Sequence, residues 1–377
     1  MTKKSLFIIC FIVLIGGGPS AYAGDFAYLT SYTLIRTPKL IQVDTTNEAI
    51  IKKIDMPNEE SLGNMVIDEK GGCFLSSFRL AERYGRNIFY YDAASGKLDQ
   101  FMHLDSIFGP KITALNGDEL IVGVEGNDLT KSKSGILFID RGSKNISQKI
   151  FFREDDPKYS SCKIIDSYYD GRKYLYATTM DFVEEEYPGQ YIGERYGFGS
   201  IVVVDVTSKE MFKTIEVPRE YDTLSGVVGV GNKIYVAAQL KGIPTFTSER
   251  KLNKELLVFS LDKGTLESTI KISPHPFELV FDKISNKLYV LHIDDDKSRN
   301  NIEVIDVKKD KIIGHLNIPS QTTASMVSSS KIYLSVGPGF MRDTRANPKI
   351  VVIDTKKDKI INEIDGLYQD ISINPKY

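Results

Sequence analysis

Two histidines in the last third of the chain stand close to carboxylates and could take part in chemistry. His275 lies between two prolines, and His292 ends a predicted strand, with Glu278 and Asp294 nearby in the sequence. Imidazoles beside carboxylates can bind a metal ion or serve as general acid and base. Structural roles for both histidines are the open alternative. His275 is therefore a catalytic candidate, with Arg219 the second, and neither is assigned.

A short acidic run follows His292. Asp294, Asp295 and Asp296, with Asn300, offer the oxygen ligands that Ca²⁺ prefers, but the run lacks the central Gly and terminal Glu of an EF-hand. The candidate metal ligands are His292, Asp294 and Asp296, and a solvated acidic loop is the alternative. No cofactor is predicted, and Ca²⁺ is the one ion that the residues suggest.

Common catalytic motifs are missing from the chain. It contains no G-x-S-x-G, Walker A, H-E-x-x-H or C-x-x-C sequence, and no tryptophan. These absences argue against common hydrolase, nucleotide, zinc-peptidase and haem chemistry. The formal net charge of −2 gives no preference for nucleic acid, which favours a basic surface.

One sequence pattern recurs seven times along the chain. An apolar run ends in an acidic residue, a polar turn follows, and a second alternating run comes after it. The seven runs end at Asp44, Asp92, Asp140, Asp205, Ser260, Asp306 and Asp354, with spacings of 48, 48, 65, 55, 46 and 48 residues. Self-similarity at such a period is typical of propellers and solenoids.

Each copy of the pattern predicts a β-hairpin, whose strands we call C and D. Most copies are preceded by a second pair of predicted strands, A and B. Lys287-Leu288-Tyr289-Val290-Leu291 is the clearest strand B. The chain starts with a lone B-type strand at 26–30 and stops with a lone A-type strand at 370–373. The sequence therefore predicts one all-β domain over 24–377, a seven-bladed β-propeller of four-stranded antiparallel blades, closed by the C-terminal strand pairing into blade 1.

These repeats resemble those of the YVTN-repeat, YncE-like β-propellers of bacteria. The resemblance is carried by Lys287-Leu288-Tyr289-Val290, by Val351-Val352-Ile353-Asp354-Thr355 and by the prolines Pro57, Pro218, Pro276 and Pro319. It covers nearly the whole chain after residue 23, although Leu291 and Ala237 stand where the family has Asn. The motif implies the fold and says little about function, because propellers host many functions.

All long insertions are predicted B–C loops, which share one face with the D–A loops. These loops are 79–86, 126–134, 181–199, 241–254, 294–300 and 339–348. Insertions on one face usually mark the working face of a repeat protein, and tolerated surface variation is the alternative. The candidate ligand or partner residues there are Tyr187, Tyr191, Arg195, Tyr196, Phe198, Phe246, Arg250, Arg342 and Arg345. The D–A loops are predicted to surround the mouth of the central channel. The candidate residues that they place there are Glu59, Asp105, Lys111, Asp156, Arg219, Asp222, His275 and Gln369.

The N-terminus has the pattern of a cleaved signal peptide. Lys3 and Lys4 precede an apolar run at 6–14, and Ala21-Tyr22-Ala23 fits cleavage before Gly24. We therefore expect residues 1–23 to be removed, a periplasmic or secreted product, and no membrane span afterwards. Cys73 and Cys162 would then remain, expected as free thiols, with a disulfide as the alternative.

Three functions remain open from the sequence. A non-enzymatic exported propeller that binds a protein or another ligand through its loop face, expected as a monomer, is favoured. A lactonase-like hydrolase with a polar site at the channel mouth is the second. The third is the scaffold subunit of a periplasmic redox complex, for which the missing tryptophan and missing cofactor motifs give no support.

Overall fold

The computed structural model describes residues 26–33, 36–44, 46–56, 61–78, 86–104, 108–125, 134–152, 161–184, 195–241, 251–292, 300–318, 321–328, 330–337 and 349–365. Every element in these segments is a β-strand, and the strands form seven antiparallel sheets, numbered here in chain order. No helix in the described segments is long and apolar enough to cross a membrane.

The first sheet has three strands, and the next two sheets have four each. Sheet 1 contains β1 (Phe26–Thr33), β2 (Arg36–Asp44) and β3 (Ala49–Asp55). Sheet 2 contains β4 (Ser61–Ile67), β5 (Cys73–Phe78), β6 (Asn87–Asp92) and β7 (Lys97–His103). Sheet 3 contains β8 (Phe108–Asn116), β9 (Glu119–Glu125), β10 (Gly135–Asp140) and β11 (Ile146–Phe151).

The remaining sheets have four strands, and one of them has an added short strand. Sheet 4 contains β12 (Ser161–Tyr169), β13 (Tyr174–Glu184), β14 (Arg195–Asp205) and β15 (Glu210–Glu216). Sheet 5 contains β16 (Tyr221–Val230), β17 (Lys233–Lys241), β18 (Lys251–Leu252), β19 (Glu255–Ser260) and β20 (Thr265–Lys271). Sheet 6 contains β21 (Pro276–Asp282), β22 (Lys287–His292), β23 (Asn300–Asp306) and β24 (Lys311–Ile318). Sheet 7 contains β25 (Gln321–Ser328), β26 (Lys331–Gly337), β27 (Lys349–Asp354) and β28 (Lys359–Ile364).

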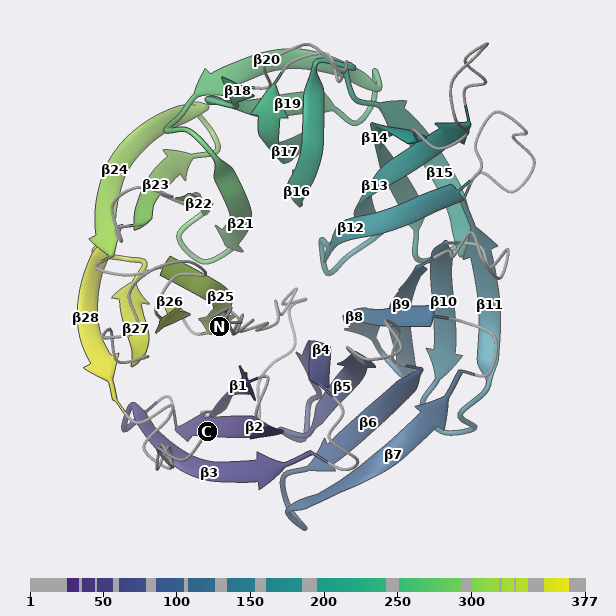
Figure 1. Ribbon diagram of the computed structural model, residues 1–377, viewed down its shortest axis with the longest axis vertical. Helices are drawn as coiled ribbons and strands as arrows, with labels where there is room; N and C mark the ends of the chain where they lie inside the picture. Colours follow the sequence, from purple (N-terminus) through teal and green to yellow (C-terminus); the bar gives the residue numbers. More distant parts are fainter. Residues whose placement is uncertain are drawn as a thin grey trace, which may run out of the picture.

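The sheets stand around a common axis like the blades of a propeller (Figure 1). In sheets 2 to 7 the first strand lies nearest the axis and the last lies at the rim. The prediction of four-stranded antiparallel blades is confirmed for these six sheets. Sheet 1 has three described strands, and the strand predicted to complete it, 370–373, lies outside the described residues.

The turn that joins the last two strands is built alike in all seven sheets. Each contains one residue in the left-handed region, with φ between 50° and 69°, which reverses the chain tightly. These residues are Glu48, Gly96, Lys144, Lys209, Gly264, Asp310 and Asp358. These turns lie at the same end of the ring as the turns between the first two strands of each sheet. We call this end the turn end and the opposite end the loop end.

The recurring acidic residue caps the same turn. Asp44 Oδ1 accepts the backbone N–H groups of Thr46 and Asn47 at 2.8 and 3.0 Å. Hydrogen bonds from Asn47 hold the pKa of Asp44 below its usual value. In the fifth copy the Ser260 hydroxyl takes this role and accepts the N–H of Lys263. The repeated Asp is therefore a turn-forming residue.

Lysine and tyrosine from one sheet bind the turn of the next sheet. Lys287 Nζ and the Tyr289 hydroxyl donate to the Asp358 carboxylate at 2.6 and 2.7 Å. Lys233 and Tyr235 bind Asp310 in the same way, at 2.5 and 2.6 Å. The Lys-x-Tyr part of the repeat is thus an inter-sheet contact, in which the charged partner accepts two charge-assisted bonds.

A similar lysine contact joins the last sheet to the first. Lys331 Nζ, in β26, donates to Glu48 in the turn between β2 and β3 at 2.6 Å, and the Asn362 side chain donates to it at 2.5 Å. Buried Tyr333, Ile350 and Val352 share one apolar cluster with Leu40 and Ile41 of β2. Sheets 7 and 1 therefore pack side by side although they stand at opposite ends of the chain.

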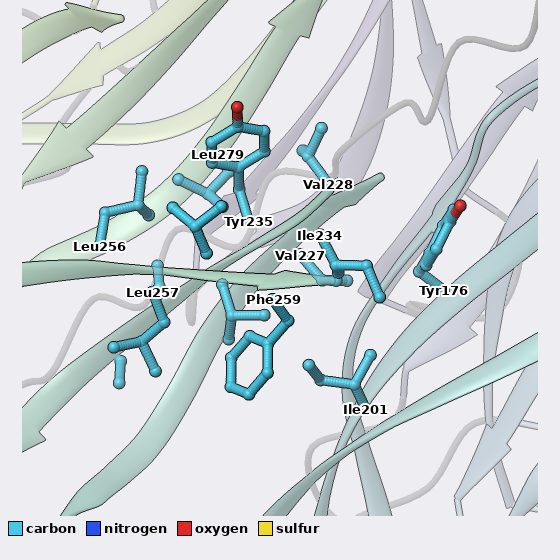
Figure 2. Packing of buried hydrophobic residues seen from close by; sticks show 14 of the residues in the cluster. Tyr176, Ile201, Val227, Val228, Ile234, Tyr235, Leu256, Leu257, Phe259 and Leu279 are labelled. Atoms are coloured by element: carbon cyan, nitrogen blue, oxygen red, sulfur yellow. The ribbon is translucent and has the colours of Figure 1, made fainter. Parts of the chain in front are cut away.

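The largest apolar cluster lies between sheets 4, 5 and 6. Figure 2 shows Tyr176 and Ile201 of sheet 4, Tyr235 of sheet 5 and Leu279 of sheet 6 within it. A Cβ on Gly229 would lie 2.1 Å from the Tyr176 ring, so only glycine allows this close packing. Cores between neighbouring sheets, rather than one central core, hold the molecule together.

Several sequence-based boundaries need correction. Part of the predicted B–C loop at 181–199 is strand, because β13 and β14 continue their pairing out to Glu184 and Arg195. The predicted loop at 241–254 contains β18, which pairs with β17. Lys111 and Asp222 lie in β8 and β16 rather than in D–A loops. Cys73 and Cys162 are buried in sheets 2 and 4 and are not joined by a disulfide, as expected.

Candidate functional site

The most unusual polar cluster of the described residues surrounds Glu303 at the loop end of sheet 6. Glu303 and His292 are both about 3% exposed, and His292 Nε2 lies 3.1 Å from the carboxylate. The Ser273 hydroxyl and backbone N–H also donate to Glu303, at 2.8 and 3.1 Å. Burial raises the pKa of Glu303, but the bonds from His292 and Ser273 outweigh it and leave that pKa lowered. Glu303 is therefore a buried carboxylate satisfied by several donors.

Both ring nitrogens of His292 face protein acceptors. Nδ1 lies 3.1 Å from the carbonyl oxygen of Pro274, and Nε2 faces Glu303. A metal ion needs a ring nitrogen with a free lone pair, so His292 does not fit the predicted role of metal ligand in this arrangement. Asp294 and Asp296 lie outside the described residues, and no described group of His, Cys, Asp and Glu could hold a metal ion.

Glu303 was missed by the sequence-based prediction, although the repeat carries a signal for it. Three residues before the recurring Asp, the other six copies have Ile41, Phe89, Leu137, Val202, Leu257 and Val351, all apolar. Glu303 replaces this apolar residue with an acid, and it is still buried. A buried acid at an apolar position of the repeat needs partners, and His292 and Ser273 supply them.

The loop between β20 and β21 is held from both sides by these contacts. Ser273 and Pro274 bind Glu303 and His292 of sheet 6, and the His275 N–H donates to the Asn253 carbonyl of sheet 5 at 3.0 Å. His275, the catalytic candidate, is half-buried here with φ = 61°. A non-glycine residue in this region costs roughly 1 kcal/mol or more, a strain often found at functional sites. His275 thus lies in this fixed loop, and His292, the last residue of β22, contacts the loop at Pro274, next to His275.

Sheet 4 carries a strand pair that extends beyond its sheet at the loop end. β13 and β14 remain paired to Glu184↔Arg195, whereas β15 pairs with β14 only as far as Ser200 and β12 reaches Phe182. Two predicted contact residues, Arg195 and Tyr196, lie on the part of β14 that extends beyond both β12 and β15. A third, Phe198, lies beyond the end of β15, where β13 is still paired with β12. In sheet 5, β17 and β18 form a smaller extension on the same end.

A second polar group lies beside the extension of sheet 5. The Tyr221 hydroxyl donates to Glu255 at 2.7 Å, and Lys241 Nζ approaches Glu255 and Tyr221 at 2.5 and 3.1 Å. Arg219, the other catalytic candidate, is exposed in the turn before β16. For Asp222 the structure gives only the backbone, paired with Leu240.

The innermost strands are joined by polar bonds from sheet to sheet. Lys111 Nζ donates to the Ile164 carbonyl at 2.7 Å and forms an ion pair with Glu125 at 3.0 Å, so this predicted mouth residue joins β8 to β12. Asp166 Oδ2 accepts the Val227 N–H at 3.0 Å and joins β12 to β16. Burial raises the pKa of Asp166 to about 6, while that N–H and Lys111 act in the opposite direction.

Many predicted site residues cannot be compared with the structure. The contact candidates Tyr187, Tyr191, Phe246, Arg250, Arg342 and Arg345 lie outside the described residues. The same holds for the mouth candidates Glu59, Asp105, Asp156 and Gln369. Their predicted roles therefore stay predictions.

Comparison with known proteins identifies the fold and no more than the fold. No protein-family model matches the chain, and no curated protein matches it in sequence. A chain of the mitotic checkpoint complex aligns with a TM-score of 0.55 and 10% identity, over 89% of this chain and 92% of that one. Sqt1 of Saccharomyces cerevisiae aligns with a TM-score of 0.53 and 9% identity, over 96% and 86% of the two chains. A chain of Kuenenia stuttgartiensis hydrazine synthase aligns with a TM-score of 0.56 and 14% identity, over 94% and 97%. Likeness at such low identity shows the fold alone, and together with the blades described above it shows that the chain is a β-propeller.

Proposed function

We propose that the protein is an exported, non-enzymatic β-propeller that binds a protein or another ligand with its loop end. The projecting pair β13–β14 carries this proposal, because it extends beyond its sheet at that end and bears Arg195 and Tyr196, with Phe198 just before the projecting part. Aromatic and arginine residues are enriched where proteins bind partners. The mitotic checkpoint complex is an assembly by its name, and the shared fold fits a binding scaffold.

The fold behind this function is a seven-bladed ring. Sheet 1 would be its seventh blade, completed by the strand predicted at 370–373. The repeats of this ring would be YncE-like. Three observations support the ring: seven turns with the same left-handed residue, the Lys331–Glu48 contact, and the apolar cluster shared by sheets 7 and 1.

A photo-crosslinking experiment tests the binding face. In one variant a benzophenone amino acid replaces Tyr196 on β14. In the other it replaces Lys308, which is exposed in the turn between β23 and β24 at the turn end. Both variants are expressed in the organism that makes the protein and irradiated in the cell. We expect one dominant adduct from position 196 and none from position 308. Adducts from position 308 alone, or equal adducts from both, would overturn the proposal.

Export has its own measurement. Cleavage before Gly24 predicts a periplasmic or secreted product whose intact mass lacks residues 1–23. A cytoplasmic protein that keeps residues 1–23 would contradict this part of the proposal.

The lactonase alternative is decided by turnover. A panel of lactones is offered to the purified protein and to His275→Ala. Turnover that disappears in the variant would replace binding with hydrolysis as the function.

A further inference from the structure

Two neighbouring sheets have nearly identical turns at the turn end. Residues 304–313 of sheet 6 and 352–361 of sheet 7 both read Val-Ile-Asp-x-Lys-Lys-Asp-Lys-Ile-Ile and differ only at Val307 and Thr355. Each turn has three exposed lysines, which gathers positive charge over two sheets that stand side by side (Figure 1). The six are Lys308, Lys309 and Lys311 of sheet 6 and Lys356, Lys357 and Lys359 of sheet 7.

The carboxylates of both turns are used inside the protein. Asp306 accepts two N–H groups of its own turn, and Asp310 accepts bonds from a lysine and a tyrosine of sheet 5. Asp354 and Asp358 are bound in the same way in sheet 7. The middle lysine of each turn approaches the capping Asp at 3.5 to 3.7 Å with about 70% of its side chain exposed, and the other four lysines form no ion pair with a described residue. The lysine charge at the surface is therefore only partly balanced.

An exposed isoleucine follows each of these turns on the rim strand. Every rim strand, the last of its sheet, has a one-residue β-bulge, and Ile313 of β24 and Ile361 of β28 are the extra residues. Ile51 of β3 has the same position in sheet 1, the next sheet along the ring (Figure 1). Ile51, Ile313 and Ile361 are 49%, 49% and 43% exposed. A bulge can re-aim a side chain, and here three successive rim strands direct an apolar one to solvent.

The bulge position is occupied differently in the other four sheets. The residues there are Phe101, Ser147, Phe212 and Glu267. Phe212 is also exposed, but Lys209 and Lys213 beside it bind Glu119 and backbone carbonyls. In the described part of the chain, a turn with exposed lysines is thus joined to an exposed apolar bulge in sheets 6 and 7 alone.

Lysines beside exposed apolar side chains match the chemistry of a lipid surface. The phosphates of anionic headgroups attract lysines, and apolar residues next to them enter the boundary between headgroups and acyl chains. Nucleic acid also offers phosphates, but it has no apolar layer behind them, so the isoleucines would gain nothing from it. An anionic bilayer is the partner that complements both features.

We propose that the turn-end rim of sheets 6, 7 and 1 docks on a membrane surface rich in anionic phospholipids. The six lysines contact headgroup phosphates, and Ile51, Ile313 and Ile361 enter the headgroup boundary. Docking through this surface leaves the loop end directed away from the membrane. The proposal does not depend on the ligand proposed for the loop end, because it concerns the opposite end of the propeller.

Vesicle sedimentation of the full-length protein tests this surface. One set of vesicles contains equal parts of phosphatidylglycerol and phosphatidylcholine, and the other contains phosphatidylcholine alone. We expect tighter binding to the anionic vesicles and weaker binding when salt is added, because salt screens the lysines. Equal affinity for both sets, or no binding to either, would overturn the proposal.

A lysine variant locates the binding surface. Each lysine near an anionic membrane strengthens binding about fivefold, so replacing four of them with Gln should weaken it more than about a hundredfold. The four replaced are those without an ion pair: Lys308, Lys311, Lys356 and Lys359. The control replaces four lysines exposed on other sheets with Gln, which removes the same charge, and should bind as the wild type does: Lys97, Lys149, Lys254 and Lys271. Equal losses in both variants would contradict the proposal.

An isoleucine variant distinguishes a lipid surface from an acidic protein. Ile313→Ser with Ile361→Ser keeps every lysine and should weaken binding to anionic vesicles about tenfold. Phe212→Ser is the control, because it removes an exposed apolar residue from the same bulge position in sheet 4. Unchanged binding of the isoleucine variant would show a surface that recognises charge alone and would overturn the lipid assignment. A protein adduct from position 308 in the crosslinking experiment would do the same, because a lipid layer gives none.

Discussion

The two ends of the propeller use the same repeat for different purposes. At the turn end, each repeat places a capped turn beside the preceding sheet, and Lys287 and Tyr289 bind Asp358 there. At the loop end, the repeat is interrupted: Glu303 replaces an apolar residue, and β13 and β14 extend beyond their sheet. Regular contacts hold neighbouring sheets together, and departures from the repeat supply candidates for function.

At the turn end, the sheets meet at the same position of the repeat, but which sheet supplies the positive charge varies. Sheets 5, 6 and 7 each present a lysine to a carboxylate of the next turn. Sheet 3 presents Glu119 to Lys209, the left-handed residue of the next turn, at 2.6 Å. The repeat therefore fixes where two sheets meet, and either arrangement of charges serves the contact.

The largest effect is expected at the loop end, where one buried charge organises a whole loop. Glu303→Ala leaves His292 and Ser273 without their acceptor, which should lower the free energy of unfolding by about 3 to 5 kcal/mol. Urea unfolding measures this loss. His315→Ala is the control, because His315 is exposed and lies 3.8 Å from the same carboxylate, and it should change little. Equal small losses in both variants would mean that Glu303 does not hold the loop.

A pH-dependent difference is expected from the inner strand of sheet 4. The folded pKa of Asp166 is raised to about 6, so its contribution to stability is present below the unfolded value near 3.8 and is lost as pH rises through 6. Asp166→Asn keeps an acceptor for Val227 and does not titrate. Relative to this variant, the wild type should lose up to about 3 kcal/mol between pH 4 and pH 7. Stability curves of the two proteins that run parallel across this range would exclude the raised pKa.

A smaller loss is expected from the turn-end hydroxyl of sheet 6. Tyr289→Phe keeps the buried ring and removes a bond to Asp358, which should cost about 1.5 to 3 kcal/mol. A double-mutant cycle with Asp358→Asn isolates the pair. Photo-crosslinking from position 196 should be unaffected by this variant, since the contact lies at the opposite end. Loss of the crosslinked adduct without loss of stability would contradict the separate roles given to the two ends.

The smallest effect is expected from reversing one charge pair. Glu119→Lys combined with Lys209→Glu gives sheet 3 the polarity of sheets 5 to 7, and the double variant should unfold within about 1 kcal/mol of the wild type. Each single variant places like charges together and should be less stable than the double. A double variant less stable than both singles would show that polarity is fixed at each position.

Repetition explains what the sequence could predict. The recurring Asp, the Lys-x-Tyr strands and the period near 48 residues specify hairpins, and they predicted the antiparallel blades correctly. The partners of Lys287 and Tyr289 could not be predicted, because they lie in another repeat, about 70 residues away, and depend on how sheets stack.

The candidate site was predicted less completely for a related reason. His275 and His292 were recognised by residue type, and in the structure His292 of β22 contacts Pro274, the residue before His275. Glu303, which binds His292 and Ser273, looks like an ordinary polar residue of an alternating strand. Only an alignment of the seven copies shows that the other six have an apolar residue at this position. Lys111 and Asp222 were assigned to loops because nothing in their residue types marks where an inner strand begins.

Hydrogen exchange of β1 tests the closed ring most directly. β1 pairs with β2 on one side, and strand 370–373 is proposed to cover the other. Amides of Phe26–Thr33 that face away from β2 should exchange slowly in the full chain and rapidly in a variant ending at Asp365, while β21–β24 stay protected. Equal exchange of β1 in both proteins would contradict the closed seven-bladed ring.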